Sequence, residues 1–275
     1  MSVYPGAIPS SGDLPDAGAN LSSNPHSSLH DDVRDEVIAI ATELGVEPSG
    51  TEATVRARLD QGLGLREIVT FTSDGTFTKA TYPWLRAVRV RCQGGGGAGG
   101  GATATSAGQA SFGSGGSAGG YSESFILASN LDESISVTVG EGGTGASGVD
   151  GNAGTGSLFG ALVTTEGGNG GFTRAAGTPP LAIRGIGGAA IGTGDLAIEG
   201  GASTPAISVG ATAATVIAGA GANSFLGGGG VGTTANPQPG RGFGGGGGGL
   251  GNTANSAAAP GADGADGIVI VELYA

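Results

Sequence analysis

Two short segments near the start of the chain carry apolar residues at helical spacing. In residues 28–45 the apolar positions recur at intervals of four, three and four, which places them on one helix face. Ser28 and Asp31 form an N-terminal cap, and Gly45 is suited to end the helix. A helix of two heptads is too short to be stable alone in water, so we expect its apolar face to associate with other helices. The residues of this face are Val33, Val37, Ile40 and Leu44.

A second helix is predicted after Pro48. Ser49 and Glu52 have the spacing of a capping box, and an apolar face follows before the glycines at 62 and 64. This face consists of Val55, Leu59 and Leu63. We therefore assign residues 28–65 to a helical association segment.

From residue 66 onward the apolar pattern becomes that of β-strands. β-Branched and aromatic residues or apolar alternation predict strands near 67–79, 84–92, 134–140 and 267–274. Asp74-Gly75 lies between two such runs and predicts a tight hairpin in the first of these ranges. The residues between the strands are dominated by glycine.

Glycine enrichment is confined to this C-terminal region, since 54 of the 62 glycines fall at or after Gly94. Collagen is excluded because glycine does not recur strictly at every third position, and the interspersed strands disfavour a flexible linker. A packed array of polyproline-II-like glycine helices fits better, because their backbone groups point outward and can bond to neighbours. We expect the glycine runs 94–97, 227–230 and 244–249 to be interior rods. Single apolar residues are expected to fill seams at the rod ends or under turns: Phe159, Leu162, Phe172, Ile183, Ile186, Ile191, Phe225 and Phe243.

Composition and charge narrow the classes of function. With 11 basic and 23 acidic residues the formal charge is −12, which argues against a nucleic-acid partner. One cysteine excludes an intrachain disulfide, and no zinc-module spacing occurs. No apolar run is long enough for a membrane span, and the N-terminus lacks the features of a signal peptide. We therefore expect that the chain does not insert into a membrane and that it is synthesised in the cytoplasm.

Residues 1–27 are rich in Pro, Ser, Asn and Gly and predict an extended arm that orders against another chain. The arm leads into "HSSLHDDVRDEVIAIATELGVEPSGTEATVRARLD", which resembles the helical segment of tail-fibre and minor tail proteins of bacteriophages that infect actinobacteria. The match consists of His26 and His30, Leu44-Gly45, Pro48, Gly50, Thr54-Val55 and Arg58-Leu59. "FTSDGTFTKATYPWLRAVRVRCQGGGGAGGG", "SVTVGEGGTG" and "GIVIVELYA" together resemble the glycine-rich C-terminal domain of phage tail fibres.

The resemblance implies a mainly β and irregular protein that forms a homotrimer in the virion. Residues 1–27 would join other tail-tip proteins, residues 28–65 would trimerise as a short coiled coil, and residues 66–275 would form a glycine-rich head that recognises the host surface. A purely structural tail-tip spacer or cap without receptor binding is the alternative.

Two glycine-poor insertions are the candidate receptor contacts, because binding residues concentrate in loops carried on a rigid scaffold. Residues 172–184 and 233–243 contain prolines, aromatic residues and the only arginines after Arg91. Connecting turns are the plainer interpretation of both. The candidate contact residues are Phe172, Arg174, Pro179, Pro180, Arg184, Asn236, Pro237, Arg241 and Phe243.

No group of residues predicts catalysis or a cofactor. His26 and His30 are weak metal candidates, because no further ligand set accompanies them. Cys92 lies in a strand pattern, which indicates a buried apolar role. The carboxylate pairs Asp132-Glu133 and Asp195/Glu199 lack a surrounding glycosidase motif, so we expect a protein that is not an enzyme.

Overall fold

The computed structural model describes residues 37–38 and 64–275. The chain divides into two compact units, residues 1–63 and 64–275. Val37 and Ile38 have helical backbone, and the Val37 side chain is exposed. The remaining predictions for residues 1–63, namely the arm, the helices, the positions Val33, Ile40 and Leu44, and the pair His26 and His30, lie outside the described residues.

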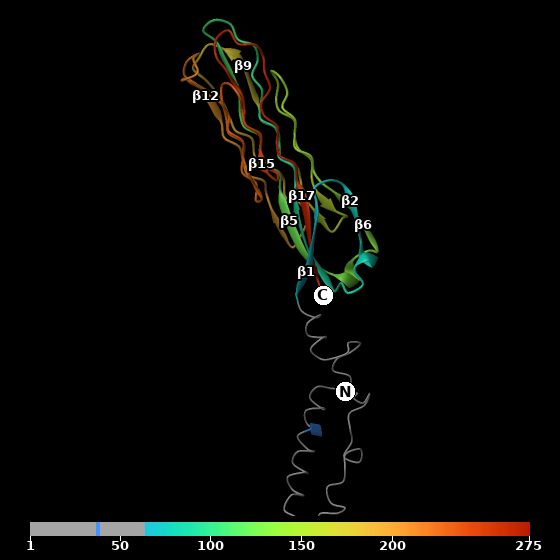
Figure 1. The fold of residues 1–275 in the computed structure, drawn as a ribbon. Helices are drawn as coiled ribbons and strands as arrows, with labels where there is room; N and C mark the ends of the chain where they lie inside the picture. The colour runs from blue at the N-terminus through green and yellow to red at the C-terminus, as the bar shows by residue number, and fades with distance from the viewer. Residues whose placement is uncertain (1–36, 39–63) are drawn as a thin grey trace, which may run out of the picture. The chain divides into compact units, whose positions relative to one another are not determined.

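Two antiparallel sheets form a sandwich at the end of the second unit where Gly64 and Ala275 lie, which we call the near end (Figure 1). The larger sheet has the order β1-β17-β3-β5-β11 and the smaller one β2-β6-β7-β8. Alternate residues of each strand point into the space between the sheets, where Phe77, Val90 and Val271 belong to one apolar core. The larger sheet contains β1 (Leu65–Phe71), β17 (Ile268–Tyr274), β3 (Ala87–Gln93), β5 (Tyr121–Leu127) and β11 (Leu196–Ile198), and the smaller one β2 (Gly75–Thr78), β6 (Ser134–Thr138), β7 (Leu158–Phe159) and β8 (Val163–Thr164).

The predicted hairpin at Asp74-Gly75 is wrong, because the two strands that flank it belong to different sheets. β1 pairs with β17 and β2 pairs with β6. Gly75 does not have the positive φ that a type I′ turn requires. This turn therefore carries the chain from one layer of the sandwich to the other. The Asp74 carboxylate holds it in place by accepting a hydrogen bond from the Val139 N–H at 2.8 Å.

Short strands continue the structure away from the sandwich. They form the sheets β16-β4-β9 and β10-β12-β13 and the pair β14-β15. Two single 3-10 turns, Lys79–Thr81 and Ala128–Asn130, lie at the near end. The short strands are β4 (Ala110–Gly113), β9 (Thr173–Gly177), β10 (Leu181–Ile183), β12 (Ala206–Ser208), β13 (Val216–Ile217), β14 (Gly227–Gly228), β15 (Arg241–Gly242) and β16 (Gly251–Asn252).

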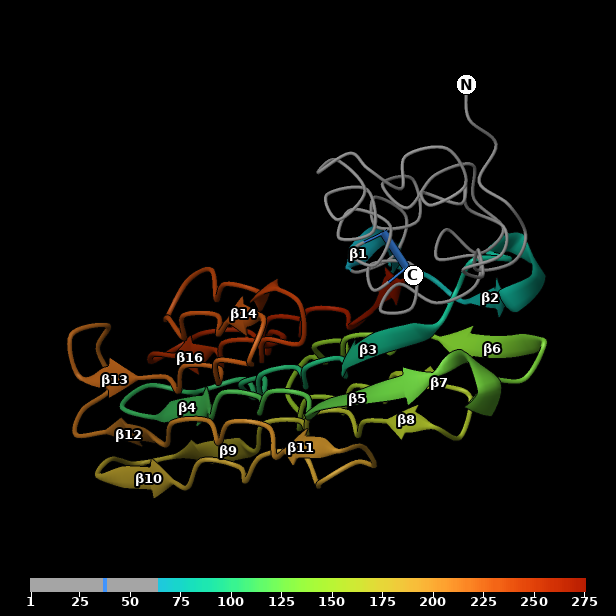
Figure 2. The ribbon, with the colours of Figure 1, turned by 90° about the horizontal axis from the view of Figure 1, so that it is seen from below.

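Between the sandwich and these short strands, glycine-rich segments run side by side (Figure 2) and form what we call the glycine lattice. Residues 94–102 lie at its centre and donate their N–H groups to three neighbours in rotation. Residues 94, 97 and 100 donate to segment 114–120, residues 95, 98 and 101 to segment 149–155, and residues 96, 99 and 102 to segment 259–265, all at 2.9–3.0 Å. Carbonyls of the same segment accept from residues 143, 168, 171, 247 and 250. A period of three with lateral bonding on all sides is the pattern of packed polyproline-II-like helices.

The run of six glycines at 244–249 is also interior, as predicted. All six residues are buried. Gly246 and Gly249 donate to Ala222 and Gly219, whereas Gly247 donates to Gly97 at 2.9 Å. The backbone of this segment is thus bonded to several neighbours.

Not every glycine run is interior. Gly227 and Gly228 form β14, pair with β15 and are only partly buried, so the prediction for the run 227–230 is wrong there. The expectation that single apolar side chains fill seams at the rod ends or under turns also fails in part: Phe159 is fully buried, but Leu162, Ile191 and Phe225 are exposed. Backbones in direct contact leave no seam for a large side chain, so several of these residues project outward.

Candidate functional site

The end of the second unit opposite the near end, which we call the far end, is built from a cluster of turns (Figure 1). The Asn255 N–H donates to the Ser106 carbonyl and the Ala254 N–H to the Ala211 carbonyl at 3.1 Å, which ties three turns together. A fourth turn joins β9 to β10, and the Ala176 N–H of β9 donates to the Thr103 hydroxyl at 2.8 Å. The turns of the far end comprise residues 103–109, 178–180, 209–215, 234–236 and 253–258.

The first predicted contact segment, 172–184, extends along the far-end half of the lattice as β9, a turn and β10. The Arg184 guanidinium lies over the Phe172 ring at 5.1 Å from its centroid, which joins the two ends of the segment. Arg174 is exposed in β9, opposite Phe112 of β4. Pro179 and Pro180 occupy the turn, and the peptide bond between them is cis.

The second predicted segment, 233–243, does not form a single surface. Asn236 and Pro237 lie at the far end, next to the bridge between Thr233 and Leu250. Arg241 and Phe243 come just before Gly244, and Gly244 is six residues before Leu250 in the lattice segment. Six residues of a polyproline-II-like segment span about 19 Å, so Arg241 and Phe243 lie far from the turns.

Sequence reasoning missed the most exposed apolar group at the far end. Ile207 of β12 is paired with Ile217 of β13, and both side chains are exposed. Val209, in the turn that follows β12, is 71% exposed. A third glycine-poor stretch, "STPAISVGATAATVI", was the available signal, and its β-branched residues mark it as a strand pair rather than a glycine rod.

Few charges lie at the far end. In these turns and short strands or next to them, the ionisable side chains among the described residues are Asp150, Arg174 and Arg184. Asp150 accepts a hydrogen bond from the Thr173 N–H at 2.6 Å and so has a structural role. This surface therefore offers apolar side chains, hydroxyls and two arginines to a ligand.

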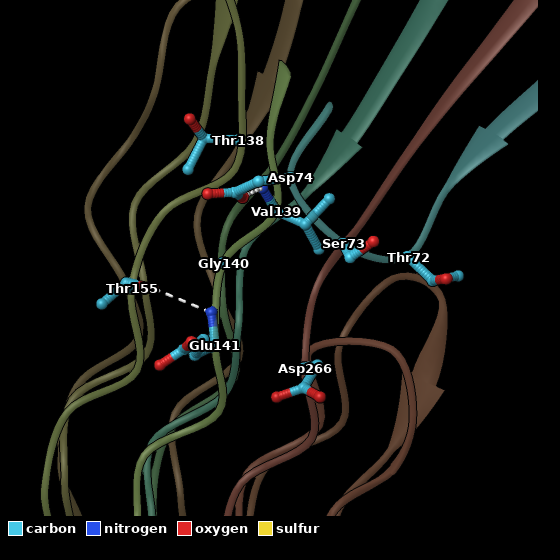
Figure 3. A pocket seen from close by; sticks show the side chains of 9 residues that line it. All are labelled: Thr72, Ser73, Asp74, Thr138, Val139, Gly140, Glu141, Thr155 and Asp266. Atoms are coloured by element: carbon cyan, nitrogen blue, oxygen red, sulfur yellow. Dashed lines mark hydrogen bonds between the residues drawn. The ribbon is translucent and has the colours of Figure 1, made fainter. Parts of the chain in front are cut away.

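A cavity of about 310 Å³ lies elsewhere, beside the turn between β1 and β2 (Figure 3). Its acidic residues are Asp74, Glu141 and Asp266. Asp74 and Asp266 accept hydrogen bonds from the N–H groups of Val139 and Gly142, each at 2.8 Å. Because these carboxylates cap backbone groups, and because no group of three potential metal ligands occurs among the described residues, the cavity is not arranged as a metal site.

The sequence profile of a family described as a glycine-rich domain matches residues 72–274. The chain belongs to this glycine-rich domain family. No curated protein matches the sequence. The matched residues include both sheets of the sandwich except β1, which ends at Phe71, together with the glycine lattice and the far end.

Three of the side chains considered for catalysis, Cys92, Glu133 and Asp195, have structural contacts. Cys92 is fully buried in the sandwich core, and burial raises the pKa of its thiol to about 12, so it is not an activated nucleophile. Glu133 pairs with Lys79 at 3.3 Å, and Asp195 accepts a hydrogen bond from the Phe125 N–H at 3.0 Å. No helix among the described residues is long and apolar enough to cross a bilayer.

Proposed function

We propose that this chain is a bacteriophage tail-fibre protein, located in the virion, whose glycine-rich domain contacts the host cell surface through its far end. One observation carries the proposal. The first and last residues of the domain lie together at the near end, where the Ala275 N–H donates to the Gly64 carbonyl at 3.3 Å. Attachment through residues 1–63 therefore leaves the opposite end free to project.

The lattice suits this role because it separates the scaffold from the binding loops. Backbone hydrogen bonds between residues such as Gly97, Ser117 and Gly247 hold the lattice together, so loop side chains contribute little to its stability. Loops on such a rigid scaffold can differ in sequence without disturbing the fold. The proposed function is binding without catalysis.

The ligand chemistry follows from the residues of the far end. Ile207, Val209 and Ile217 supply apolar contacts, whereas Arg174 and Arg184 can bind an acidic or hydroxyl-rich group. A host-surface glycan or protein is the partner proposed. Three copies, held together by the residues on the face of Val33 and Val37, would add avidity to individually weak sites.

Adsorption of the labelled full-length protein to a panel of actinobacterial cells tests this function. We expect Val209→Asp combined with Ile217→Asp to reduce binding at least tenfold, while Ile191→Asp, at an apolar site outside the far-end turns that is about as exposed as Ile217, leaves it unchanged. Equal binding by the unaltered chain, the double variant and the control contradicts a contact through the far end and favours the alternative role of a structural spacer or cap. The same alternative is favoured if the unaltered chain binds no cells but an antibody raised against it labels the tail tip of virions.

The oligomeric state is tested separately by light scattering on the full chain. We expect the mass of three copies, and a decrease towards one copy when Ile40→Asp disrupts the predicted helical face. A stable monomer for the unaltered chain contradicts the trimer.

A further inference from the structure

The outer face of the larger sheet, which points away from the sandwich core, carries large exposed apolar side chains. Ile68, Phe125 and Leu127 are 52%, 57% and 53% exposed, and Leu196 of the edge strand β11 is 45% exposed. The registers place Ile68 opposite Glu272, Glu272 opposite Arg89, and Arg89 opposite Phe125, so these residues form one row across four strands. Exposed antiparallel sheet faces are normally polar, and apolar patches of this kind mark contact surfaces.

Charged residues of the same face form a network that is already paired. Arg89 donates to both carboxylate oxygens of Glu123 at 2.9 Å, and Arg91 approaches Glu272 at 2.7 Å. The hydroxyl of Tyr274 donates to Glu272 at 2.9 Å. Burying an isolated charge is costly, but a network whose members satisfy one another can be covered without leaving an ion unpaired.

The charge distribution favours a second copy of this chain as the occupant. The five strands of the larger sheet carry three basic and three acidic residues, whereas the rest of residues 64–275 carries five basic and ten acidic ones. Two copies therefore repel each other through most of their surfaces but not through this neutral face. The edge strand β1 also follows directly on the segment proposed to trimerise.

We propose that the outer face of the larger sheet is where the glycine-rich domains of neighbouring copies contact one another. The contact buries the row of Ile68 and Phe125, together with Leu127, against the same face of another copy and encloses the paired network. This inference rests on the proposed self-association of the chain, and it adds a domain contact to the one proposed for the helices.

Thiol labelling tests the contact, because Cys92 is the sole cysteine and is fully buried with a raised pKa. Leu127→Cys places a reactive thiol on the outer sheet face, and Val209→Cys provides a control at the far end, with both sites more than half exposed in the single chain. Maleimide labelling rates and the mass by light scattering are measured on the same full-length samples. We expect Leu127→Cys to react at least tenfold more slowly than Val209→Cys in the oligomer, and at a similar rate once dilution or Ile40→Asp makes the chain monomeric.

The other outcomes separate this contact from the proposed trimer. Fast labelling of Leu127→Cys in a trimeric sample overturns the domain contact and leaves the trimer standing. If the Leu127→Cys variant without Ile40→Asp is monomeric and labels fast, both the domain contact and the trimer are overturned. Slow labelling that persists in a monomer shows that the same chain covers the face, which also overturns the contact between copies.

Discussion

Replacing Gly246 with alanine is the most direct perturbation of the glycine lattice. A Cβ built at Gly246 would fall on the carbonyl of Gly116, well inside van der Waals contact, with the Gly116 carbonyl carbon at 2.7 Å and the Ala222 nitrogen at 3.0 Å. All of these atoms belong to the backbone, so no side-chain rotation can relieve the overlap. The two segments must move apart.

The cost can be worked out from the hydrogen bonds that such a movement breaks. The bonds that join the two segments run from Gly116 to Gly247 at 2.9 Å, from Gly119 to Gly244 at 3.0 Å and from Gly113 to Leu250 at 2.7 Å. At about 1 kcal/mol net for each bond, Gly246→Ala lowers the free energy of unfolding by about 3 kcal/mol. For a protein of this size that corresponds to a decrease in Tm of roughly 6–12 °C.

Differential scanning calorimetry of the full chain measures this decrease. Gly187→Ala is the matched control, because a Cβ at Gly187 meets no atom within 4 Å and its φ is not positive. We expect the control to change Tm by less than about 2 °C. If Gly246→Ala also changes Tm by less than about 2 °C, the backbones are not in close contact and the lattice interpretation is wrong.

Three further predictions concern the sandwich. Cys92 should not react with a disulfide reagent in the native protein, and one thiol per chain should react after denaturation, because burial raises its pKa to about 12. Glu272→Ala should lower the free energy of unfolding by about 2 kcal/mol in urea titrations, since it leaves the partly buried Arg91 without its ion-pair partner, whereas Glu133→Ala at an exposed ion pair should cost less than about 1 kcal/mol. For Glu123, burial opposes ionisation, but hydrogen bonds from a tyrosine and an arginine outweigh it and lower the pKa below the usual 4.5. Its stabilising contribution is therefore present above pH 4.5 and is lost as the pH falls through the lowered pKa, and Glu123→Gln should remove this part of the pH dependence of stability.

Local sequence patterns allowed part of the fold to be predicted. The alternation in "RAVRVRC" and the β-branched run in "GIVIVEL" indicate strands, and the structure has β3 and β17 there. The burial of the run 244–249 was predictable because only glycine permits backbones to approach this closely. In these cases the residues themselves determine the local conformation.

The missed features depend on contacts between residues far apart in the chain. Asp74-Gly75 has the composition of a hairpin turn, but β1 pairs with the C-terminal strand β17, about 200 residues later. β5 was not predicted although it pairs with β3 along its whole length, because "YSESFIL" mixes polar and apolar residues on both faces. The division of segment 233–243 between the far end and the lattice likewise depends on where the chain reverses, which composition does not reveal.

The three-residue period also explains why the candidate binding surface lies at the far end. Because a lattice segment such as 94–102 donates in turn to three neighbours, even a Cβ at its glycines would fall on a neighbouring backbone. Large residues are therefore excluded from the lattice interior and collect at its ends and outer surface. At the near end they form the sandwich core around Phe77 and Phe159. At the far end a smaller core forms around Phe112 and Val216, whereas Val209 stays exposed outside it. The same packing rule that stabilises the lattice thus leaves apolar side chains exposed at the far end, where we propose that the partner binds.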